Sequence, residues 1–256
     1  MIIKVNKYFV DIILPVYNSE NFILKTINSI LNQKFKNWRL MIIDDKSSDN
    51  TLNIIKKNYS VYIKSKKFFL YKNSENKGQG YSRNFLLKRT KAKYIAFIDS
   101  DDLWKKNKLY EQINFMEENK YDFTFTDYNI LKENKKINII KAPNFFNYNS
   151  FVRNTFIATS TIILNRKAIG KLNFPNLRIC EDYFFKCNLL KKFTAFKLCK
   201  VNTYYRIRKD SLQSHRLRVL YEVWKINKNF NNMRLFQNFL SLLFISLNSL
   251  KKYGLR

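Results

Sequence analysis

The sequence predicts an α/β fold in which helices flank a mostly parallel sheet, followed by a basic helical extension. Over residues 10–102, short apolar runs rich in β-branched residues alternate with segments of helical spacing, and this alternation is typical of parallel sheets. Three of the four expected strands end in polar residues, and ligands bind at the carboxyl ends of parallel strands. Residues 234–252 have a helical pattern with a wide apolar face.

Each expected element has its own local signal. Residues 10–14 form a β-rich run that stops at Pro15, and Ser19 fits the N-cap of the helix that follows. Gly78 and Gly80 mark a loop before the third helix. In chain order, we expect strand 10–14, helix 21–32, strand 39–43, helix 51–59, strand 67–71, helix 82–91 and strand 93–98.

The composition limits both the class of protein and its partners. The chain has 256 residues, with 48 Lys and Arg against 19 Asp and Glu, and a net charge of +29. An apolar fraction of 46% excludes a disordered polybasic tail. The charge fits an anionic partner, which is a nucleic acid, an anionic membrane or a phosphate-bearing substrate. Composition alone leaves these three open.

The cysteine and histidine content excludes several kinds of site. Three cysteines over this length favour a reducing compartment over a disulfide framework. His215 is the only histidine and no C-x-x-C occurs, which argues against zinc and against a catalytic triad. A catalytic metal would therefore bind carboxylates, as Mg²⁺ or Mn²⁺ do. The sequence shows neither a secretory leader nor an apolar run long enough to span a membrane, so we expect a cytoplasmic location.

A cluster of acids directly follows the strand expected at 93–98. Asp99, Asp101 and Asp102 lie within four residues, and carboxylates so close together repel one another when ionised. A divalent cation offsets that repulsion and can bridge the phosphates of a nucleotide. The alternative is a solvated turn in which Asp102 caps a helix from Leu103. The position at a strand end, in a chain poor in acids, favours the metal site.

Two further acidic pairs are more ambiguous. Asp44 and Asp45 follow the second strand, where a carboxylate can accept hydrogen bonds from a base or a ribose. No G-x-G-x-x-G follows the first strand and no G-x-x-x-x-G-K-[ST] occurs, which argues against a dinucleotide-binding dehydrogenase and a P-loop protein. Glu181 and Asp182 open an amphipathic helix. Taken alone, they complement the helix dipole more readily than they form a general base.

The order and spacing of these segments resemble the family-2 glycosyltransferases of GT-A fold. The resemblance covers roughly residues 9–215. Lys46 departs from it, because the family usually has a glycine in that turn, and a lysine must avoid or tolerate a left-handed conformation there. The matching segments are residues 10–18, 30–33, 39–51, 76–84 and 94–104 with Lys108 and Gln112, the pair 181–182, and Tyr205-Arg206 with Ser211.

The resemblance implies roles for the matching residues. Tyr17 would stack on the base, Asp45 would bind the uracil or ribose, and Asp182 would be the catalytic base of an inverting reaction. Asp101 and Asp102 would lie nearest the Mn²⁺ or Mg²⁺ and the diphosphate. The whole nucleotide-sugar site would comprise Pro15, Tyr17, Glu20, Asp45, Arg83, Asp99 and Asp101. The expected acceptor side comprises Trp104, Thr159, Ser160 and Glu181.

The carboxyl third of the chain has a different character. From Lys186 to Arg256 there are 16 Lys and Arg and two acids. Within the helix expected at 234–252, polar residues form a narrow stripe and apolar residues cover the rest, which is the composition of a helix that lies on anionic lipid. A helix docked on its own domain or on a second subunit is the alternative. We therefore expect a GT-A domain over 1–215 and a basic amphipathic extension over 216–256, with membrane contact or a homo-oligomer left open.

The leading hypothesis combines the resemblance with the charge. It is a metal-dependent, inverting transfer of a hexose or N-acetylhexosamine from a UDP-sugar to an oligosaccharide or lipid-linked acceptor. The lipid would be undecaprenyl diphosphate, in O-antigen, capsule or lipooligosaccharide synthesis, with the enzyme peripheral on the inner face of the cytoplasmic membrane. The rival is a basic nucleic-acid-binding module, which does not explain acids at strand ends, so we expect no nucleic-acid partner. An inactive membrane-bound scaffold of the same fold is a third hypothesis.

Overall fold

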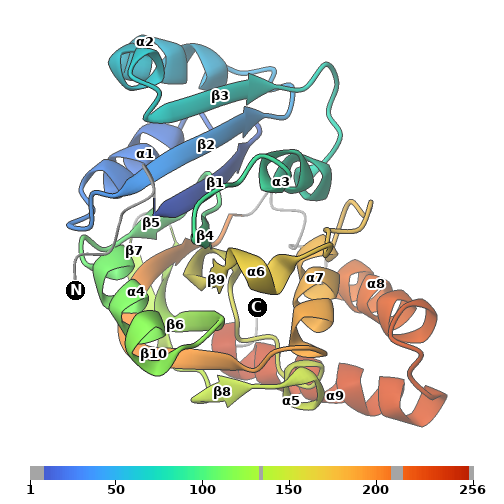
Figure 1. The fold of residues 1–256 in the computed structure, drawn as a ribbon. Helices are drawn as coiled ribbons and strands as arrows, with labels where there is room; N and C mark the ends of the chain where they lie inside the picture. The colour runs from blue at the N-terminus through green and yellow to red at the C-terminus, as the bar shows by residue number, and fades with distance from the viewer. Residues whose placement is uncertain (1–8, 133–134, 209–215, 254–256) are drawn as a thin grey trace.

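The computed structural model describes residues 9–132, 135–208 and 216–253. Within them the chain folds around one sheet in the order β3-β2-β1-β4-β9-β6-β10-β5, with β7 paired to β6 and β8 to β10 (Figure 1). Ser211, His215 and the predicted domain boundary at 215/216 lie outside the described residues. The strands are β1 (Val10–Val16), β2 (Trp38–Asp44), β3 (Phe68–Lys72), β4 (Tyr94–Phe97), β5 (Leu103–Trp104), β6 (Phe123–Lys132), β7 (Lys135–Ile140), β8 (Phe145–Phe146), β9 (Ile163–Asn165) and β10 (Ala195–Arg206).

Helices cover both faces of this sheet because the central strands are apolar on both sides. Ile12 and Leu14 of β1 pack with α1, α2 and α4, whereas Ile13 packs with α3 and α7. The helices are α1 (Ile23–Leu31), α2 (Thr51–Lys64), α3 (Gln79–Leu87), α4 (Lys108–Asn119), α5 (Tyr148–Phe151), α6 (Arg166–Ile169), α7 (Glu181–Leu190), α8 (Arg216–Asn229) and α9 (Leu235–Tyr253), with a 3-10 turn at Thr159–Thr161.

The predicted fold class is confirmed. Strands β3, β2, β1 and β4 are mutually parallel, and β6 and β10 form a second parallel pair. The short strand β9 joins these two parts and runs antiparallel to both β4 and β6. The carboxyl ends of β1, β2 and β4 therefore lie along one edge of the sheet, where the polar residues that follow them gather.

Two local details were open or wrong at the level of sequence. Leu103 begins a short strand that pairs with β10, not a helix, and α4 begins only at Lys108. The reason is that Trp104 is buried and its indole Nε1 donates to the carbonyl oxygen of Ser160, which fixes this segment against the sheet. Lys46 has a φ of 63°, so the turn after β2 tolerates the left-handed conformation despite its side chain.

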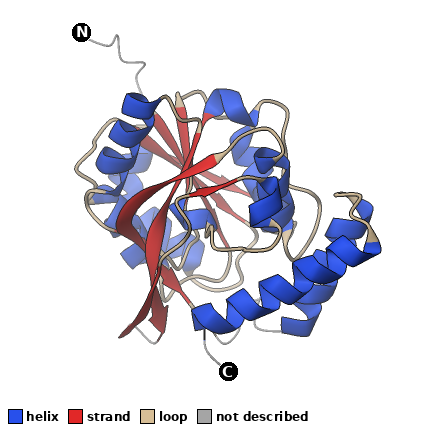
Figure 2. Ribbon diagram, turned by 90° about the horizontal axis from the view of Figure 1, so that it is seen from below, coloured by secondary structure: helices blue, strands red, loops and turns tan. Residues whose placement is uncertain are grey.

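The predicted terminal helix forms as α9 and is held against the domain by α8 and α7 (Figures 1 and 2). The Tyr183 hydroxyl, on α7, donates to Asn227 Oδ1 on α8 at 2.8 Å. Asn227 Nδ2 in turn donates to Asn238 Oδ1 at 3.1 Å and to Ser241 Oγ at 3.0 Å, both on α9. No helix in the described part of the chain is long and apolar enough to cross a membrane.

Candidate active site

Arg83 joins the two groups of acids that the sequence left apart. Its side chain lies in α3 and is 1% exposed. One guanidinium nitrogen, Nη2, donates to Asp99 Oδ1 at 2.7 Å, and the other, Nη1, donates to Glu181 Oε1 at 2.8 Å. Burial opposes the charge of Arg83, but the two carboxylates outweigh it and raise its pKa. The loop after β4 and the start of α7 are thereby fixed side by side.

Arg83 and Glu181 are more deeply buried than their predicted binding roles suggest. Arg83, predicted to line the nucleotide-sugar site, is 1% exposed and holds Asp99 in place. Glu181, expected on the acceptor side, is buried against Arg83, and burial raises its pKa to about 7 despite that partner. Both residues build the floor of the site rather than its binding surface.

Asp102, predicted to bind the metal, is engaged by hydrogen bonds from two distant parts of the chain. Its Oδ2 accepts a hydrogen bond from Ser160 Oγ, and its Oδ1 accepts one from the backbone N–H of Arg206 at 2.8 Å. The side chain is 1% exposed, and burial, together with the nearby charges of Asp101 and Asp99, raises its pKa well above the usual range. A carboxylate so enclosed ties the loop after β4 to β10 and is not presented to an ion.

Ser160 and Trp104, which the sequence places on the acceptor side, are hydrogen-bonded to each other, and Ser160 also bonds to the acidic loop. Ser160 is fully buried. Its hydroxyl donates to Asp102 and accepts the backbone N–H of Asp99 at 3.0 Å, while its carbonyl accepts Trp104 Nε1 at 2.8 Å. These bonds fix the conformation of the segment after β4, because Ser160 alone holds Asp99, Asp102 and Trp104.

Replacing Ser160 by alanine tests this structural role. The change leaves the Asp99 N–H and an Asp102 oxygen without a partner in a buried place, so we expect the free energy of unfolding to fall by about 1–3 kcal/mol. Urea denaturation of the variant and of the exposed-serine control Ser74→Ala measures the difference. An unchanged stability, with a raised KM for acceptor, would return Ser160 to the acceptor wall.

Asp101 is the acid of this loop that suits a cation. Its side chain is 20% exposed, and its Oδ2 lies 3.6 Å from Arg208 Nη1. Burial and the neighbouring charge of Asp99 raise the pKa of Asp101 to about 6, so the two carboxylates resist being ionised together. A divalent cation relieves that repulsion, and Mg²⁺ or Mn²⁺ needs only one or two carboxylates when phosphates supply further oxygens. Within the described residues, no cluster of three or more His, Cys, Asp or Glu is arranged as a complete metal site.

Asp182 is held and oriented through one of its two oxygens. Oδ2 accepts a hydrogen bond from Thr159 Oγ1 at 3.0 Å and from Lys186 Nζ at 2.7 Å. Lys186 lies one turn along α7 and also donates to the carbonyl oxygen of Ile157 at 3.0 Å. Burial alone would raise the pKa of Asp182, but the charge and hydrogen bond of Lys186 lower it to about 2. The carboxylate, 20% exposed, is therefore ionised at neutral pH.

Thr159 and Lys186 show what sequence reasoning found and missed around Asp182. Thr159 was expected to touch the acceptor, but it is 6% exposed and donates to Asp182 instead. Lys186 was not among the predicted site residues. Its spacing of four residues from Asp182 along an expected helix was a usable signal, because such pairs share one helix face.

The nucleotide side of the site opens at the end of β1. Tyr17 is 46% exposed and its ring is free to stack on a base, whereas Pro15 is buried inside β1 and shapes the strand end. Glu20 has a structural partner, since its Oε2 accepts the backbone N–H of Asn50 at the start of α2, 2.9 Å away. The negative charge of this carboxylate also interacts favourably with the positive end of the α2 helix dipole.

Asp45, which the sequence predicts to bind uracil or ribose, is buried and hydrogen-bonded to the chain through both of its oxygens. It is 3% exposed. Its Oδ1 accepts from Asn73 Nδ2 at 2.7 Å and from the Lys77 backbone N–H at 2.9 Å, and its Oδ2 accepts from the Gly78 backbone N–H at 2.8 Å. With both oxygens engaged, the carboxylate holds the loop that leads into α3.

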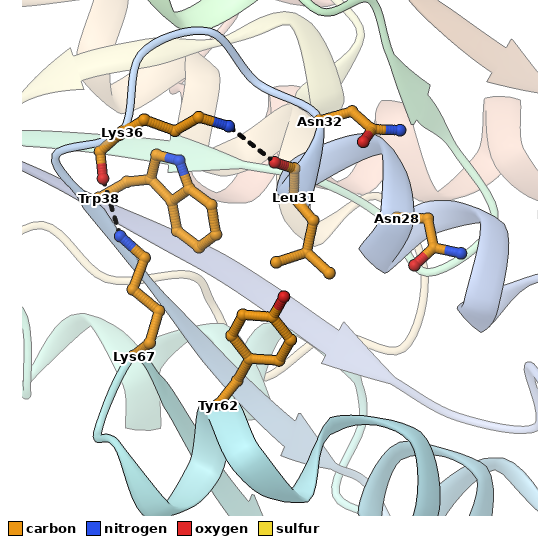
Figure 3. Close-up of a pocket in the computed structure, with 7 residues that line it drawn as sticks. All are labelled: Asn28, Leu31, Asn32, Lys36, Trp38, Tyr62 and Lys67. Carbon is orange, nitrogen blue, oxygen red and sulfur yellow. Dashed lines mark hydrogen bonds between the residues drawn. The ribbon is translucent and has the colours of Figure 1, made fainter.

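A separate hollow lies away from these acids. Its volume is about 550 Å³, and it is lined by Asn28, Leu31, Asn32, Lys36, Trp38, Tyr62 and Lys67 (Figure 3). Trp38 begins β2 and Lys67 precedes β3, so the hollow lies at the amino ends of parallel strands. Lys67 Nζ lies 4.0 Å from the centre of the Trp38 ring, and burial lowers the pKa of this lysine to about 8. The hollow is thus at the opposite edge of the sheet from the candidate active site.

Comparison with known proteins identifies the family. The profile of glycosyl transferase family 2 matches residues 11–172. A relative from Escherichia coli, the UDP-Glc:alpha-D-GlcNAc-diphosphoundecaprenol beta-1,3-glucosyltransferase WfaP, is 34% identical over 245 residues, which cover 95% of each chain. The chain belongs to glycosyl transferase family 2. The resemblance seen in the sequence is confirmed, and the protein is a glycosyltransferase.

Solved structures agree on the fold of this glycosyltransferase. Staphylococcus aureus TarS in complex with UDP-GlcNAc superposes with a TM-score of 0.71 at 20% identity, covering 96% of this chain and 73% of that one. The mannosyltransferase PcManGT from Pyrobaculum calidifontis, in complex with GDP-Man and Mn²⁺, superposes with a TM-score of 0.69 at 14% identity, covering 98% and 77%. The GT-A fold expected from the sequence is thereby confirmed.

Proposed function

We propose that this glycosyltransferase moves a hexose or N-acetylhexosamine from a UDP-sugar to a lipid-linked saccharide, with inversion at the anomeric carbon. The observation that carries the proposal is the juxtaposition, through Arg83, of the acids after β4 with the ionised Asp182 at the start of α7. The Escherichia coli relative, whose name specifies UDP-Glc and a diphosphoundecaprenol acceptor, supports the choice of donor and acceptor. The proposed biological setting is cell-surface polysaccharide synthesis.

Asp182 is the proposed base. Thr159 and Lys186 hold its Oδ2, and in the described structure no side chain is bonded to Oδ1, which is left for an acceptor hydroxyl. As the hydroxyl oxygen bonds to the anomeric carbon, its proton passes to Asp182 and the bond to the diphosphate breaks. Because Lys186 lowers the pKa of Asp182, the carboxylate is ionised at neutral pH, and it accepts the proton as the new bond forms.

The diphosphate end of the donor is proposed to lie between Tyr17 and Asp101. Asp101, with Asp99 beside it, would hold Mn²⁺ or Mg²⁺, which supplies positive charge to the departing diphosphate. The Mn²⁺ complex of the Pyrobaculum neighbour supports a divalent ion of this kind. Arg208, with its guanidinium 3.6 Å from the Asp101 carboxylate, places a further positive charge at the same point.

The enzyme is proposed to work as a peripheral protein at the cytoplasmic face of the membrane that carries its acceptor. The diphosphoundecaprenol acceptor of the Escherichia coli relative supports this location, and so does the excess of Lys and Arg in the carboxyl third. The fold and the family are those of a glycosyltransferase, which argues against the rival hypothesis of a nucleic-acid-binding module.

A screen for UDP release tests the proposed function. The protein is incubated with single UDP-sugars and Mn²⁺, with and without GlcNAc-diphosphoundecaprenol. We expect one donor to give release that depends on the metal and rises strongly with acceptor. If metal-dependent UDP binding occurred with neither transfer nor hydrolysis for any donor, the inactive scaffold would be supported instead.

Replacing Lys186 by methionine tests how the base is tuned. Lys186 depresses the pKa of Asp182, so its loss raises that pKa toward the ordinary aspartate range. The acid limb of the kcat profile should therefore move to higher pH, while the exposed control Lys192→Met keeps the wild-type profile. A profile that did not move in Lys186→Met would show that Asp182 is not the group that limits turnover at low pH.

A further inference from the structure

Helix α9 is docked with its polar side inward and its apolar side outward. Asn238, Ser241, Ile245, Asn248 and Lys252 follow one another at helical spacing and face the domain, and four of these five are polar or charged. The opposite side is apolar and open to solvent, with exposed fractions between 40% and 72%. This apolar face of α9 consists of Leu235, Phe236, Phe239, Leu243, Phe244 and Leu247.

Hydrogen bonds to a single loop explain why the helix sits this way. Ser241 Oγ donates to the carbonyl oxygen of Val152, Asn248 Nδ2 to that of Arg153 at 3.0 Å, and Lys252 Nζ to that of Thr155 at 2.7 Å. Turning the apolar face inward would break all three bonds and the contacts to Asn227 on α8. The exposed apolar face therefore belongs to a docked helix that hydrogen bonds hold in place.

Positive charge surrounds the apolar face of α9. Arg234 at its beginning and Lys251 near its end are both exposed. The Arg153 guanidinium lies 5.9 Å from the centre of the Phe244 ring. Residues 216–256 contain eight Lys and Arg and one acid. An exposed apolar strip with a basic rim is the composition of a helix that lies in the interface of an anionic bilayer.

We propose that the apolar face of α9 inserts into the interfacial region of an anionic membrane, with Arg153, Arg234 and Lys251 over the lipid headgroups. This deepens the proposed function and rests on it for the membrane as partner, but it names the contacting surface. A second copy of the chain is the less favoured occupant, because pairing two such helices brings together two strongly basic segments that repel each other.

The position of α9 links this contact to the proposed base. The loop that α9 holds, 152–155, continues directly to Ile157, whose carbonyl accepts Lys186, and to Thr159, which donates to Asp182. The membrane contact and the proposed base are thus joined by a few residues of backbone.

Vesicle flotation tests the inference without depending on activity. The full chain is mixed with phosphatidylglycerol vesicles or with phosphatidylcholine vesicles, at low and high salt. We expect binding to the anionic vesicles that weakens as salt rises. The variant Phe236→Gln with Phe239→Gln and Leu243→Gln should bind on the order of ten-fold less, while a matched control with Val61→Gln, Tyr110→Gln and Ile137→Gln, which are equally exposed elsewhere, keeps wild-type binding.

The outcomes separate this inference from the proposed function. Circular dichroism checks that both triple variants fold, and UDP release with a water-soluble acceptor should be the same in both, because none of these residues touches the site. The inference would be overturned if the wild-type protein did not bind anionic vesicles, or if the α9 variant bound them as strongly as the control variant. Neither result would affect the proposal of glycosyl transfer. A wild-type dimer that the α9 variant dissociates and that binds no vesicles would also overturn the inference.

Discussion

Replacing Asp182 by asparagine is expected to lower kcat for sugar transfer by about 10²–10⁴-fold, the usual contribution of a positioned general base. Asparagine keeps the shape of the side chain and can still accept the hydrogen bond from Thr159. It cannot take the acceptor proton, so the loss should appear in kcat with little change in the affinity for UDP. Single-turnover transfer and a separate UDP-binding titration measure the two quantities.

A matched control sharpens the result. Asp122→Asn removes a carboxylate just before β6, and no other residue of the described structure is bonded to its side chain. It should leave kcat unchanged. If Asp182→Asn retained turnover within a few fold of wild type, the base would have to be another group. Lys186 would then not tune the pKa of the catalytic base.

Replacing Asp101 by asparagine should mainly lower activity, whereas replacing Asp102 by asparagine should mainly lower stability. Asp101→Asn removes the partly exposed carboxylate next to Asp99 and Arg208, and we expect kcat/KM to fall by roughly 100-fold or more, with a higher Mn²⁺ requirement and little loss of stability. Asp102→Asn places an amide where the carboxylate accepts from Ser160 and from the Arg206 N–H. It should cost about 1–3 kcal/mol of folding free energy.

Chemical denaturation and metal titration of the two variants distinguish these expectations. Each variant serves as the control for the other, because the change is identical and the residues are adjacent. A wild-type metal requirement in Asp101→Asn, together with a raised one in a stably folded Asp102→Asn, would instead identify Asp102 as the metal-binding residue.

The fold could be predicted because its signals are local. Each strand from β1 to β4 is a short apolar run, and β1, β2 and β3 are each followed by a helix with its own spacing, so neighbouring residues contain the information. The acids at the ends of β2 and β4 stood out in a basic chain for the same reason. Even Lys46, the one departure from the family pattern, gave a correct warning of a left-handed turn.

The roles within the site depended on contacts between distant segments. Ser160 lies 58 residues from Asp102, and Glu181 lies 98 residues from Arg83. Whether a carboxylate faces a ligand or a buried donor is decided by such pairs, which no spacing rule encodes. Asp45, Asp102 and Arg83 are accordingly buried and hydrogen-bonded to other parts of the chain, which their positions in the sequence did not indicate.

Helix α9 shows a subtler limit. Its polar stripe and wide apolar face were visible in the sequence, and the pattern was compatible with docking on the domain or on lipid. In the structure, the polar stripe docks on the domain and the apolar face stays exposed. Helical periodicity alone could not show which of the two sides faces inward. Hydrogen bonds to the carbonyls of loop 152–155, supplied by the fold, decide which side faces inward.

The anomeric configuration of the product tests the central claim most directly. The claim is a single displacement at the anomeric carbon, with Asp182 as base and the UDP group leaving from the opposite side. Nuclear magnetic resonance of the product formed from an α-linked UDP-sugar reports the configuration through the coupling of the anomeric proton. We expect a β-linked product, formed by wild-type enzyme and lost in Asp182→Asn. An α-linked product would contradict the mechanism, because it requires retention and a different use of the acids gathered around Arg83.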